Sequence, residues 1–269
     1  MADTNIHVEQ HGRSIPRHLA GLIATLETNR AQVLSTADIA DILGPEVVPD
    51  RVRDVIRGLR AHGWIVSLPA GGTYEFVPAS SGPYVSGDVW VELKAALRAQ
   101  PKLRAQISLG SAAFMRGFSE RRPDRELVVI DGSVRAPSLE RTYTVIHAKA
   151  DRLFGADELR GMPVSTPERI IIEVALWSRH AGDLRAEDHW LRRLSNDLDG
   201  ARLADMLEPL SPGVAARVGF LLERFGAEDV ALAIRPHTLT GPVWIGSRSK
   251  QAVYHAAWKL YDSIGVATA

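Results

Sequence analysis

Residues 50–60 concentrate side chains that could recognise DNA. Four arginines fall within ten positions: Arg51, Arg53, Arg57 and Arg60. A guanidinium group can donate two hydrogen bonds to guanine in the major groove, or it can hold a backbone phosphate. Asp50 and Asp54 alternate with these arginines, so they can pair with Arg53 and Arg57 at i, i+3 or i+4 spacing, or accept a hydrogen bond from cytosine. The alternative interpretation is a helix face that is simply solvated.

Little else in the chain has the spacing of a catalytic or metal site. The absence of cysteine excludes disulfides, thiolate catalysis, zinc fingers and iron-sulfur clusters. A charged segment with His180 and His189 around Asp183, Glu187 and Asp188 is explained equally well by solvation as by metal binding. We therefore expect no catalytic residue, no metal and no cofactor.

Two further fragments do not complete a catalytic motif. Gly110-Ser111 lacks the GxSxG pattern of a nucleophile elbow, so Ser111 is expected to be a helix cap or a small packing residue. Asp124, Asp131 and the Glu92-Leu93-Lys94 segment resemble nuclease fragments but occur in the wrong order. The sequence therefore favours a protein that is not an enzyme.

The elements around the arginines have the order of a winged helix-turn-helix. Apolar residues from Ile15 to Leu26 recur at three and four positions, which predicts a helix. A second, short helix is expected from Ser35 or Thr36 to Gly44, and a third from Pro49 to Gly63. Two β-rich runs around Gly71-Gly72, within 64–78, predict a hairpin.

The third helix is expected to bury one stripe and expose the charged one. Residues spaced 100° apart place four apolar side chains toward the core: Val52, Val55, Ile56 and Leu59. In a winged helix the third helix enters the major groove, and the flanking residues hold phosphates. The residues that we expect to contact DNA are Thr36, Arg51, Arg53, Arg57, Arg60 and Thr73.

The rest of the chain predicts a larger domain of mixed α/β character. We expect residues 1–82 to form the winged helix domain and 83–269 the C-terminal domain, with 79–83 as a linker of small residues, glycine and proline, so the fold class is α+β. Helices are expected at 89–99, 111–118, 167–177, 184–194, 201–207, 214–225 and 250–264. Strands are expected at 127–131, 143–147 and 243–245.

Length and composition fit a globular protein of one or two domains. The 269 residues are 45% hydrophobic and 24% charged, with a formal net charge of zero. No apolar run is long enough to cross a membrane, and the first thirty residues lack the apolar stretch of a signal peptide, so we expect a cytoplasmic location. Residues 1–82 carry seven arginines and no lysine against nine acidic residues, so any basic surface must be local.

Three stretches give the whole chain a resemblance to the AbiEi-type antitoxins of type IV toxin–antitoxin systems, especially the longer actinobacterial form. They are 59–69 with 72–78, 107–118 (ISLGSAAFMRGF) and 211–223 (SPGVAARVGFLLE). Each is mostly small and apolar, so their order along the chain carries the resemblance.

The resemblance implies an N-terminal winged helix followed by a mixed C-terminal domain. It also implies repression of the protein's own operon through an inverted repeat in double-stranded operator DNA, and antagonism of a cognate nucleotidyltransferase-like toxin. Two alternatives remain at this point: a winged-helix transcription factor that responds to a small ligand, and an enzyme with a winged-helix accessory domain.

Overall fold

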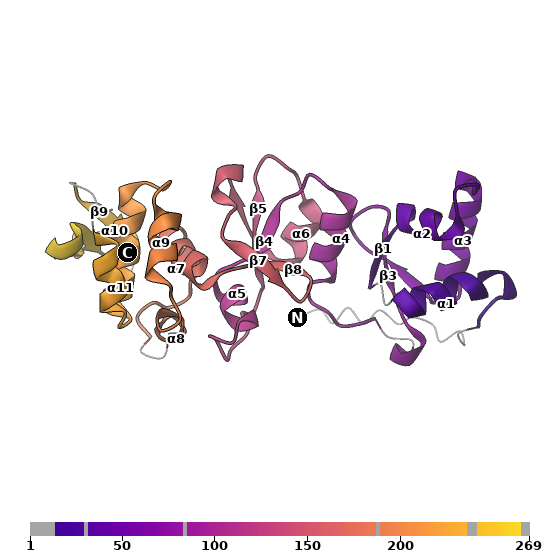
Figure 1. The fold of residues 1–269 in the computed structure, drawn as a ribbon, viewed down its shortest axis with the longest axis horizontal. Helices are drawn as coiled ribbons and strands as arrows, with labels where there is room; N and C mark the ends of the chain where they lie inside the picture. Colours follow the sequence, from indigo (N-terminus) through magenta and orange to yellow (C-terminus); the bar gives the residue numbers. More distant parts are fainter. Residues whose placement is uncertain (1–13, 30–31, 83–84, 187–188, 236–240, 265–269) are drawn as a thin grey trace. The chain divides into compact units, whose positions relative to one another are not determined.

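The computed structural model describes residues 14–29, 32–82, 85–186, 189–235 and 241–264 (Figure 1). Contacts between residues divide the chain into two units. The first comprises Met1–Leu103 with Ala136–Thr142, and the second comprises Arg104–Arg135 with Tyr143–Ala269. Both units combine helices with a β-sheet, so the expected mixed α+β class is confirmed.

The N-terminal unit opens with three helices and a small antiparallel sheet. The sheet has the strand order β1-β3-β2, and β3 pairs with both neighbours. Its first strand was not expected from the sequence, because three residues are too few to show an alternating pattern. The elements are α1 (Ala20–Asn29), β1 (Val33–Ser35), α2 (Thr36–Leu43), α3 (Pro49–Ala61), β2 (Ile65–Ser67) and β3 (Thr73–Phe76).

Local signals explain where α2 and α3 begin and end. Ser35 caps α2 in a capping box: its side chain accepts a hydrogen bond from the Asp38 backbone N–H, and the Asp38 side chain accepts one from the Ser35 N–H. Pro49 occupies the first turn of α3, where its missing N–H removes no helical hydrogen bond. Gly63 follows α3 with a φ of 69°, a conformation that favours glycine and turns the chain toward β2.

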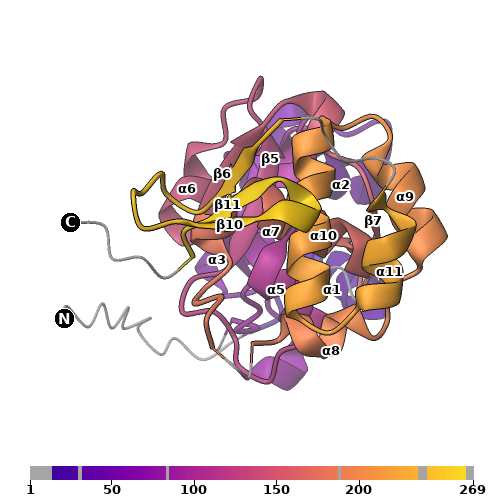
Figure 2. The ribbon, with the colours of Figure 1, turned by 90° about the vertical axis from the view of Figure 1, so that its left-hand side faces the viewer.

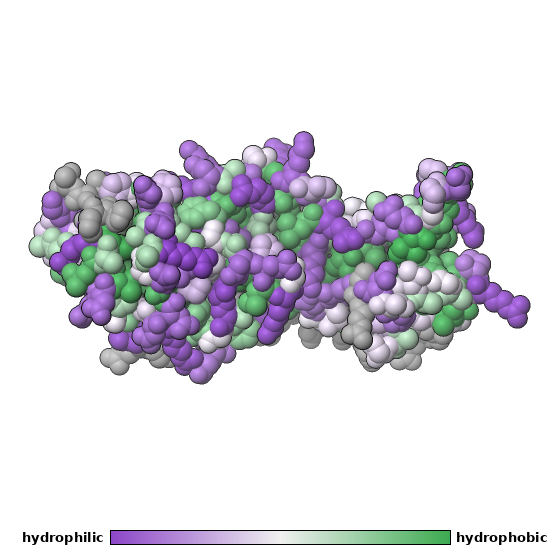
Figure 3. Space-filling view, in the orientation of Figure 1, coloured by the Kyte–Doolittle hydropathy of each residue, from purple (hydrophilic) through white to green (hydrophobic). Residues whose placement is uncertain are grey.

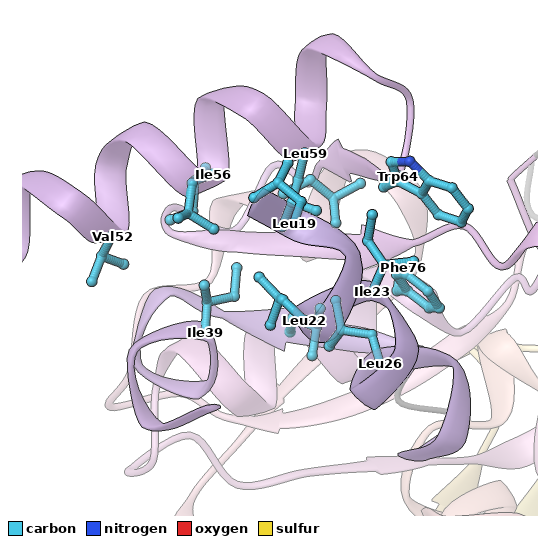
Figure 4. Packing of buried hydrophobic residues seen from close by; sticks show 13 residues of the cluster. Leu19, Leu22, Ile23, Leu26, Ile39, Val52, Ile56, Leu59, Trp64 and Phe76 are labelled. Carbon is cyan, nitrogen blue, oxygen red and sulfur yellow. The ribbon is translucent and has the colours of Figure 1, made fainter. Parts of the chain in front are cut away.

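The core of this unit lies between the three helices and the sheet (Figure 4). The four apolar residues predicted to line α3 are all buried. Trp64 and Phe76 stack with ring centroids 6.5 Å apart beside them. Because one stripe of α3 is held in this core, the opposite face of the helix is directed to solvent. The other buried partners include Leu19, Leu22, Ile23, Leu26 and Ile39.

The division of contacts differs from the boundary expected between residues 82 and 83. The N-terminal unit also includes α4 (Val91–Ala99) and α6 (Pro137–Thr142), which contact each other. The segment at 79–81 is a short 3₁₀ helix, and residues 83–84 lie outside the described part. A small buried cluster joins α4 to the N-terminal sheet: Val33, Ala70 and Ala95.

Polar contacts also attach α4 to the N-terminal sheet and to α2. Arg98 donates hydrogen bonds of 2.5 Å from Nε and Nη2 to the two carboxylate oxygens of Asp38. Buried Glu75 of β3 accepts a hydrogen bond from the Ser86 backbone N–H at 2.9 Å. A chain ending at residue 82 would therefore lose the Arg98 partner of Asp38 and the Ser86 partner of Glu75.

The Asp38–Arg98 pair predicts a stability change at acid pH. The pKa of Asp38 falls from 3.8 to about 2, chiefly because Arg98 donates to the carboxylate; burial opposes this shift and Ser35 adds to it. Because the pKa is lower in the folded state, the stabilisation is complete above about pH 4 and is lost as the pH falls toward 2. Arg98→Ala should cost about 1 kcal/mol at pH 7, since about half of the Arg98 side chain is exposed.

Urea denaturation at several pH values measures this effect. The difference between the native chain and Arg98→Ala should shrink between pH 4 and pH 2. Lys102→Ala, at an exposed position near the same helix, is the control and should change stability little. A difference that stays constant down to pH 2 would contradict the role of the ion pair.

The second unit is built on a five-stranded mixed sheet with the order β6-β5-β4-β8-β7. The pairs β5/β6 and β4/β8 are parallel, whereas β4/β5 and β7/β8 are antiparallel. The expected strand at 127–131 is present with the same bounds. The strands are β4 (Ala105–Ile107), β5 (Leu127–Asp131), β6 (Thr144–Ala148), β7 (Ala156–Leu159) and β8 (Met162–Ser165).

Helix α7 is central to this unit and contacts α5, α9 and α10. Its side chains from Glu168 to Ala175 are all buried. The helix expected at 184–194 is reduced to a short one at 191–195. None of the described helices has the length and apolar character needed to cross a membrane. The helices are α5 (Leu109–Met115), α7 (Pro167–Leu176), α8 (Leu191–Ser195), α9 (Gly200–Leu207), α10 (Pro212–Arg224) and α11 (Glu228–Ala233).

The prediction of a helix at 250–264 is wrong, because this segment forms strands. β10 (Val253–His255) and β11 (Leu260–Asp262) join β9 (Val243–Ile245) in a three-stranded sheet. Lys259 has a φ of 48° and ψ of 47°, a left-handed conformation that no α-helix contains. Pairing of β11 with the distant β9 outweighs local helix propensity here. Figure 2 shows β10 and β11 beside α10, and α10 contacts both β9 and β11.

Candidate nucleic-acid interface

The arginines of α3 lie on its solvent face, as the sequence predicted. The side chains of Arg53 and Arg57 are 70% and 77% exposed. Arg51 and Arg60 are also exposed, and neither has an ion pair with any residue in the described part of the chain. Figure 3 shows hydrophilic side chains at the upper end of α3. The helix therefore presents four cations to solvent while its opposite stripe packs in the core.

The two aspartates of α3 pair with the two central arginines. Arg57 donates to Asp54 at 2.9 Å, and Arg53 donates to Asp50, both at i, i+3 spacing. The pairing expected from the spacing is confirmed. Exposed pairs of this kind contribute little to stability. Their main effect is to hold the two guanidinium groups against the helix and to neutralise part of their charge.

A shallow groove runs between the second half of α3 and strand β2. Arg57 and Arg60 come from the helix. Val66 and Ser67, both exposed, come from the strand. The sequence did not single out these two strand residues, although the apolar Ile65 before them marks which side of β2 is buried. The groove places helix cations beside the backbone of the β2–β3 hairpin.

The two threonines expected to contact DNA have different environments. Thr36 is exposed at the start of α2; its backbone N–H donates to the Gly72 carbonyl at 2.9 Å and its hydroxyl donates to the same oxygen at 3.3 Å. It therefore ties α2 to the turn of the hairpin and keeps an exposed position. Thr73 is 1% exposed, and its hydroxyl donates to the Ala70 carbonyl. The hairpin turn directs Thr73 inward, so its inclusion among the DNA contacts is corrected.

Removing an aspartate should increase binding to DNA of any sequence. Asp54→Asn keeps the size of the side chain but removes a negative charge that would face phosphates. We expect affinity for a scrambled duplex to rise about three- to tenfold at low salt, and the ratio of specific to non-specific binding to fall. Fluorescence anisotropy with both duplexes measures this. Unchanged binding to the scrambled duplex would show that Asp54 lies away from DNA; Asp41→Asn, on exposed α2, is the control.

Arg60 should act on the phosphate backbone. It borders the groove and has no ion pair with a described residue, so its charge is available. Arg60→Ala should weaken binding to specific and scrambled duplexes by the same factor and reduce the slope of log K against log salt by about one unit. Titrations at four salt concentrations measure the slope. A loss confined to the specific duplex would instead indicate a base contact.

The other candidates from the sequence have structural roles. The Leu127 backbone N–H donates to Ser111 Oγ at 2.8 Å, so this buried serine joins α5 to β5 and does not cap a helix. His189 is buried, with Nε2 3.0 Å from the Ala181 carbonyl oxygen and its ring against Trp190. The described residues contain no group of side chains suited to holding a metal ion. Glu187 and Asp188 lie outside the described residues.

Comparison with known proteins covers both the fold and the family. Among solved structures, the chain is similar to the crystal structure of the RV2827C protein from Mycobacterium tuberculosis, with a TM-score of 0.72 and 24% identity. The similarity covers 94% of this chain and 93% of that one, so the two share a fold over nearly their whole length. No curated protein matches the sequence.

A family model described as the AbiEi antitoxin C-terminal domain matches residues 104–224. This range contains two of the three stretches that carried the resemblance, 107–118 and 211–223. It also contains the five-stranded sheet together with α7 and α10. The resemblance expected from the sequence is therefore confirmed over residues 104–224, which match the AbiEi antitoxin C-terminal domain.

Proposed function

We propose that this chain is a sequence-specific DNA-binding antitoxin that represses its own operon and acts without catalysis. The antitoxin domain at 104–224 supports the antitoxin role. The N-terminal unit would serve as a winged helix-turn-helix, with α2 and α3 as the helix pair and β2–β3 as the wing. The observation that carries the DNA-binding half of the proposal is the exposed arginine face of α3, opposite a buried apolar stripe.

The geometry of α3 suits the major groove. The groove is about 12 Å wide and admits one helix, whose exposed side chains then reach the base edges. Arg53 and Arg57 lie on that exposed side, so they would contact bases, while Arg51 and Arg60 would contact phosphates. The groove between α3 and β2 would receive the sugar-phosphate backbone of the DNA next to the contacted bases. Thr36, beside the hairpin turn, would add a hydroxyl contact to phosphate.

The charge of the N-terminal part favours binding of two copies to an inverted repeat. Residues 1–82 have fewer basic than acidic residues. The local arginine cluster of α3 therefore has to supply most of the positive charge that neutralises phosphates. Because affinity rises with the number of phosphates neutralised, one copy should bind weakly at physiological salt. Two copies on adjacent half-sites gain effective concentration. We therefore propose that the operator is a double-stranded inverted repeat occupied cooperatively.

The proposed second partner is a nucleotidyltransferase-like toxin, as expected for a member of this antitoxin class. Co-expression tests this half of the proposal. Production of the proposed cognate toxin should arrest growth, and co-production of this chain should restore it. An Arg53→Ala/Arg57→Ala variant should still restore growth when expressed from an unrelated promoter, because those residues lie outside the antitoxin domain. Failure of the native chain to restore growth would contradict the antitoxin role.

Footprinting on the chain's own promoter tests the DNA-binding half. The native chain should protect two half-sites related by inversion and spaced by whole helical turns. Replacing one half-site with scrambled sequence should reduce occupancy of the other. Protection of a single continuous site, unaffected by that replacement, would contradict cooperative binding. Absence of any protected site at physiological salt would contradict autorepression itself.

A further inference from the structure

The C-terminal three-stranded sheet has an exposed apolar edge. Its order is β10-β11-β9, so among the described residues β10 has a neighbouring strand on one side only. Val253 and Tyr254, two of the three residues of β10, are 60% and 49% exposed. An edge strand of this kind carries backbone N–H and C=O groups that another strand can pair with. This sheet lies beyond residues 104–224, so the antitoxin domain match does not assign it a role.

A row of aromatic rings crosses this sheet and ends at the exposed edge. Tyr254 of β10 is opposite Tyr261 of β11, which is opposite Trp244 of β9. The ring centroids of Trp244 and Tyr261 are 4.7 Å apart, and those of Tyr261 and Tyr254 are 4.9 Å apart. Cross-strand aromatic pairs such as Tyr254 with Tyr261 are among the stabilising contacts of antiparallel strands. The row could be extended by one more ring if a further strand paired with β10.

The other face of the sheet is fixed to α10, so the edge has a defined position. Ile245, Trp258 and Leu260 are buried on this side. The ring of Trp258 lies over Gly219 of α10, where a Cβ atom would be only 2.1 Å from it. Arg217 of α10 donates to the Trp244 carbonyl at 2.6 Å. The exposed edge is therefore held by packing and by a hydrogen bond to the strand at the opposite side of the sheet.

The sequence of the edge lacks the features that usually prevent pairing. Natural proteins protect edge strands with charged residues, proline or bulges. The seven residues 251–257, Gln-Ala-Val-Tyr-His-Ala-Ala, contain no lysine, arginine, acidic residue or proline. An unprotected edge with exposed apolar side chains is typical of a surface that is covered by another strand.

We propose that β10 pairs antiparallel with β10 of a second copy of this chain, about a two-fold axis at Tyr254. In this register Tyr254 is opposite Tyr254 of the second copy, and Val253 is opposite His255. The two aromatic rows then join into one that crosses a six-stranded sheet. Lys250 comes opposite Trp258, so no like charges face each other. A register centred on Val253 would place Tyr254 opposite Ala252 and would interrupt the row.

The segment is self-complementary in the way that a two-fold interface requires, because one patch must match itself. An uncharged strand can pair with its own copy without repulsion, which favours a second copy over a partner of opposite charge. Three paired residues on each copy form a small interface, so association is weak and depends on concentration. The proposal concerns the chain alone and does not depend on DNA binding.

Disulfide trapping tests the register directly, because the native chain has no cysteine. Directly opposed residues in an antiparallel pair have Cβ atoms about 4.5–5.5 Å apart, close enough for a disulfide after small adjustment. Under mild oxidation Tyr254→Cys should form covalent dimers at least about tenfold faster than Leu232→Cys, a similarly exposed control on α11. A mixture of Val253→Cys and His255→Cys should cross-link faster than either variant alone.

Equal cross-linking of Tyr254→Cys and Leu232→Cys would overturn the proposal. Sedimentation velocity supplies a second measurement that needs no cysteine. The native chain should sediment faster as its concentration rises, and Tyr254→Lys, which places a charge at the edge, should weaken association at least about tenfold while its circular dichroism spectrum is unchanged. A native chain that stays monomeric, or a dimer that Tyr254→Lys leaves intact, would also overturn it.

Discussion

The Arg53→Ala/Arg57→Ala variant is expected to lose sequence-specific DNA binding. Each side chain is more than two thirds exposed on the face of α3 opposite the core, so each substitution should leave the fold intact. A base-contacting arginine contributes about 1–3 kcal/mol, so the double substitution should reduce affinity for the promoter duplex at least about thirtyfold. The ratio of promoter to scrambled binding should fall toward one. Anisotropy titration of both duplexes measures these changes.

The control for this experiment is Arg121→Ala. Arg121 is 87% exposed and pairs with Asp124 at i, i+3 spacing, as the two arginines of α3 pair with their aspartates. It lies in the second unit, so its removal should change specific binding less than about twofold. Promoter binding that survives in a folded Arg53→Ala/Arg57→Ala variant would show that α3 is not the recognition element.

The second large effect is expected from Glu173→Ala in the second unit. Glu173 of α7 and its partner Arg169 are both fully buried, with Arg169 Nε 3.1 Å from Glu173 Oε1. The glutamate also accepts hydrogen bonds from Gln106, Ser165 and the Leu109 backbone N–H at 2.8–3.0 Å. Removing it leaves a buried cation and three buried donors without this acceptor. Breaking a buried ion pair costs about 3–5 kcal/mol, and we expect a loss of at least this size.

Urea denaturation compares this variant with a control on α10. Glu223 pairs with Arg235 at 3.3 Å on the surface, so Glu223→Ala should cost less than about 1 kcal/mol. Both variants remove one glutamate from an ion pair on a helix, so the comparison isolates burial. Equal losses in the two variants would contradict the proposed importance of the buried network.

The sequence predicted the elements that local signals determine. The stripe from Val52 to Leu59 gave α3 its length and its buried face, because its spacing matches one helix and cannot fit a strand. The Gly71-Gly72 turn identified the hairpin, and four consecutive apolar residues, 127–130, identified β5. The Arg–Asp pairs of α3 were also predictable, because i, i+3 contacts depend only on the helix itself.

Elements that depend on distant partners were not predictable in the same way. β1 and β4 are three residues long and are defined by pairing with strands 20 or more positions away, so no local alternation marks them. The closing segment was predicted as a helix because β9, its partner, is separated from β11 by a loop and a strand. Thr73 was placed at the surface because its burial depends on how the turn orients the next residue.

The attachment of α4 to the N-terminal unit was not predicted for the same reason, because it depends on contacts between residues far apart in the sequence. The polar stretch at 79–83 has the composition of a linker, yet the helix after it returns to the sheet through Ala95 and Arg98. A single sequence does not show that Asp38 has a partner sixty residues later. Composition therefore predicted the irregular segment at 79–83. The end of the N-terminal unit is set by the contacts that α4 makes with the rest of that unit.

The measurement that tests the central claim most directly is anisotropy titration of the full chain on its own promoter fragment, with a scrambled duplex of equal length, over a range of salt concentrations. The proposed function predicts binding at physiological salt at least about a thousandfold tighter to the promoter, and a log–log salt slope that reflects several phosphate contacts. Equal affinity for the two duplexes at every salt concentration would contradict it.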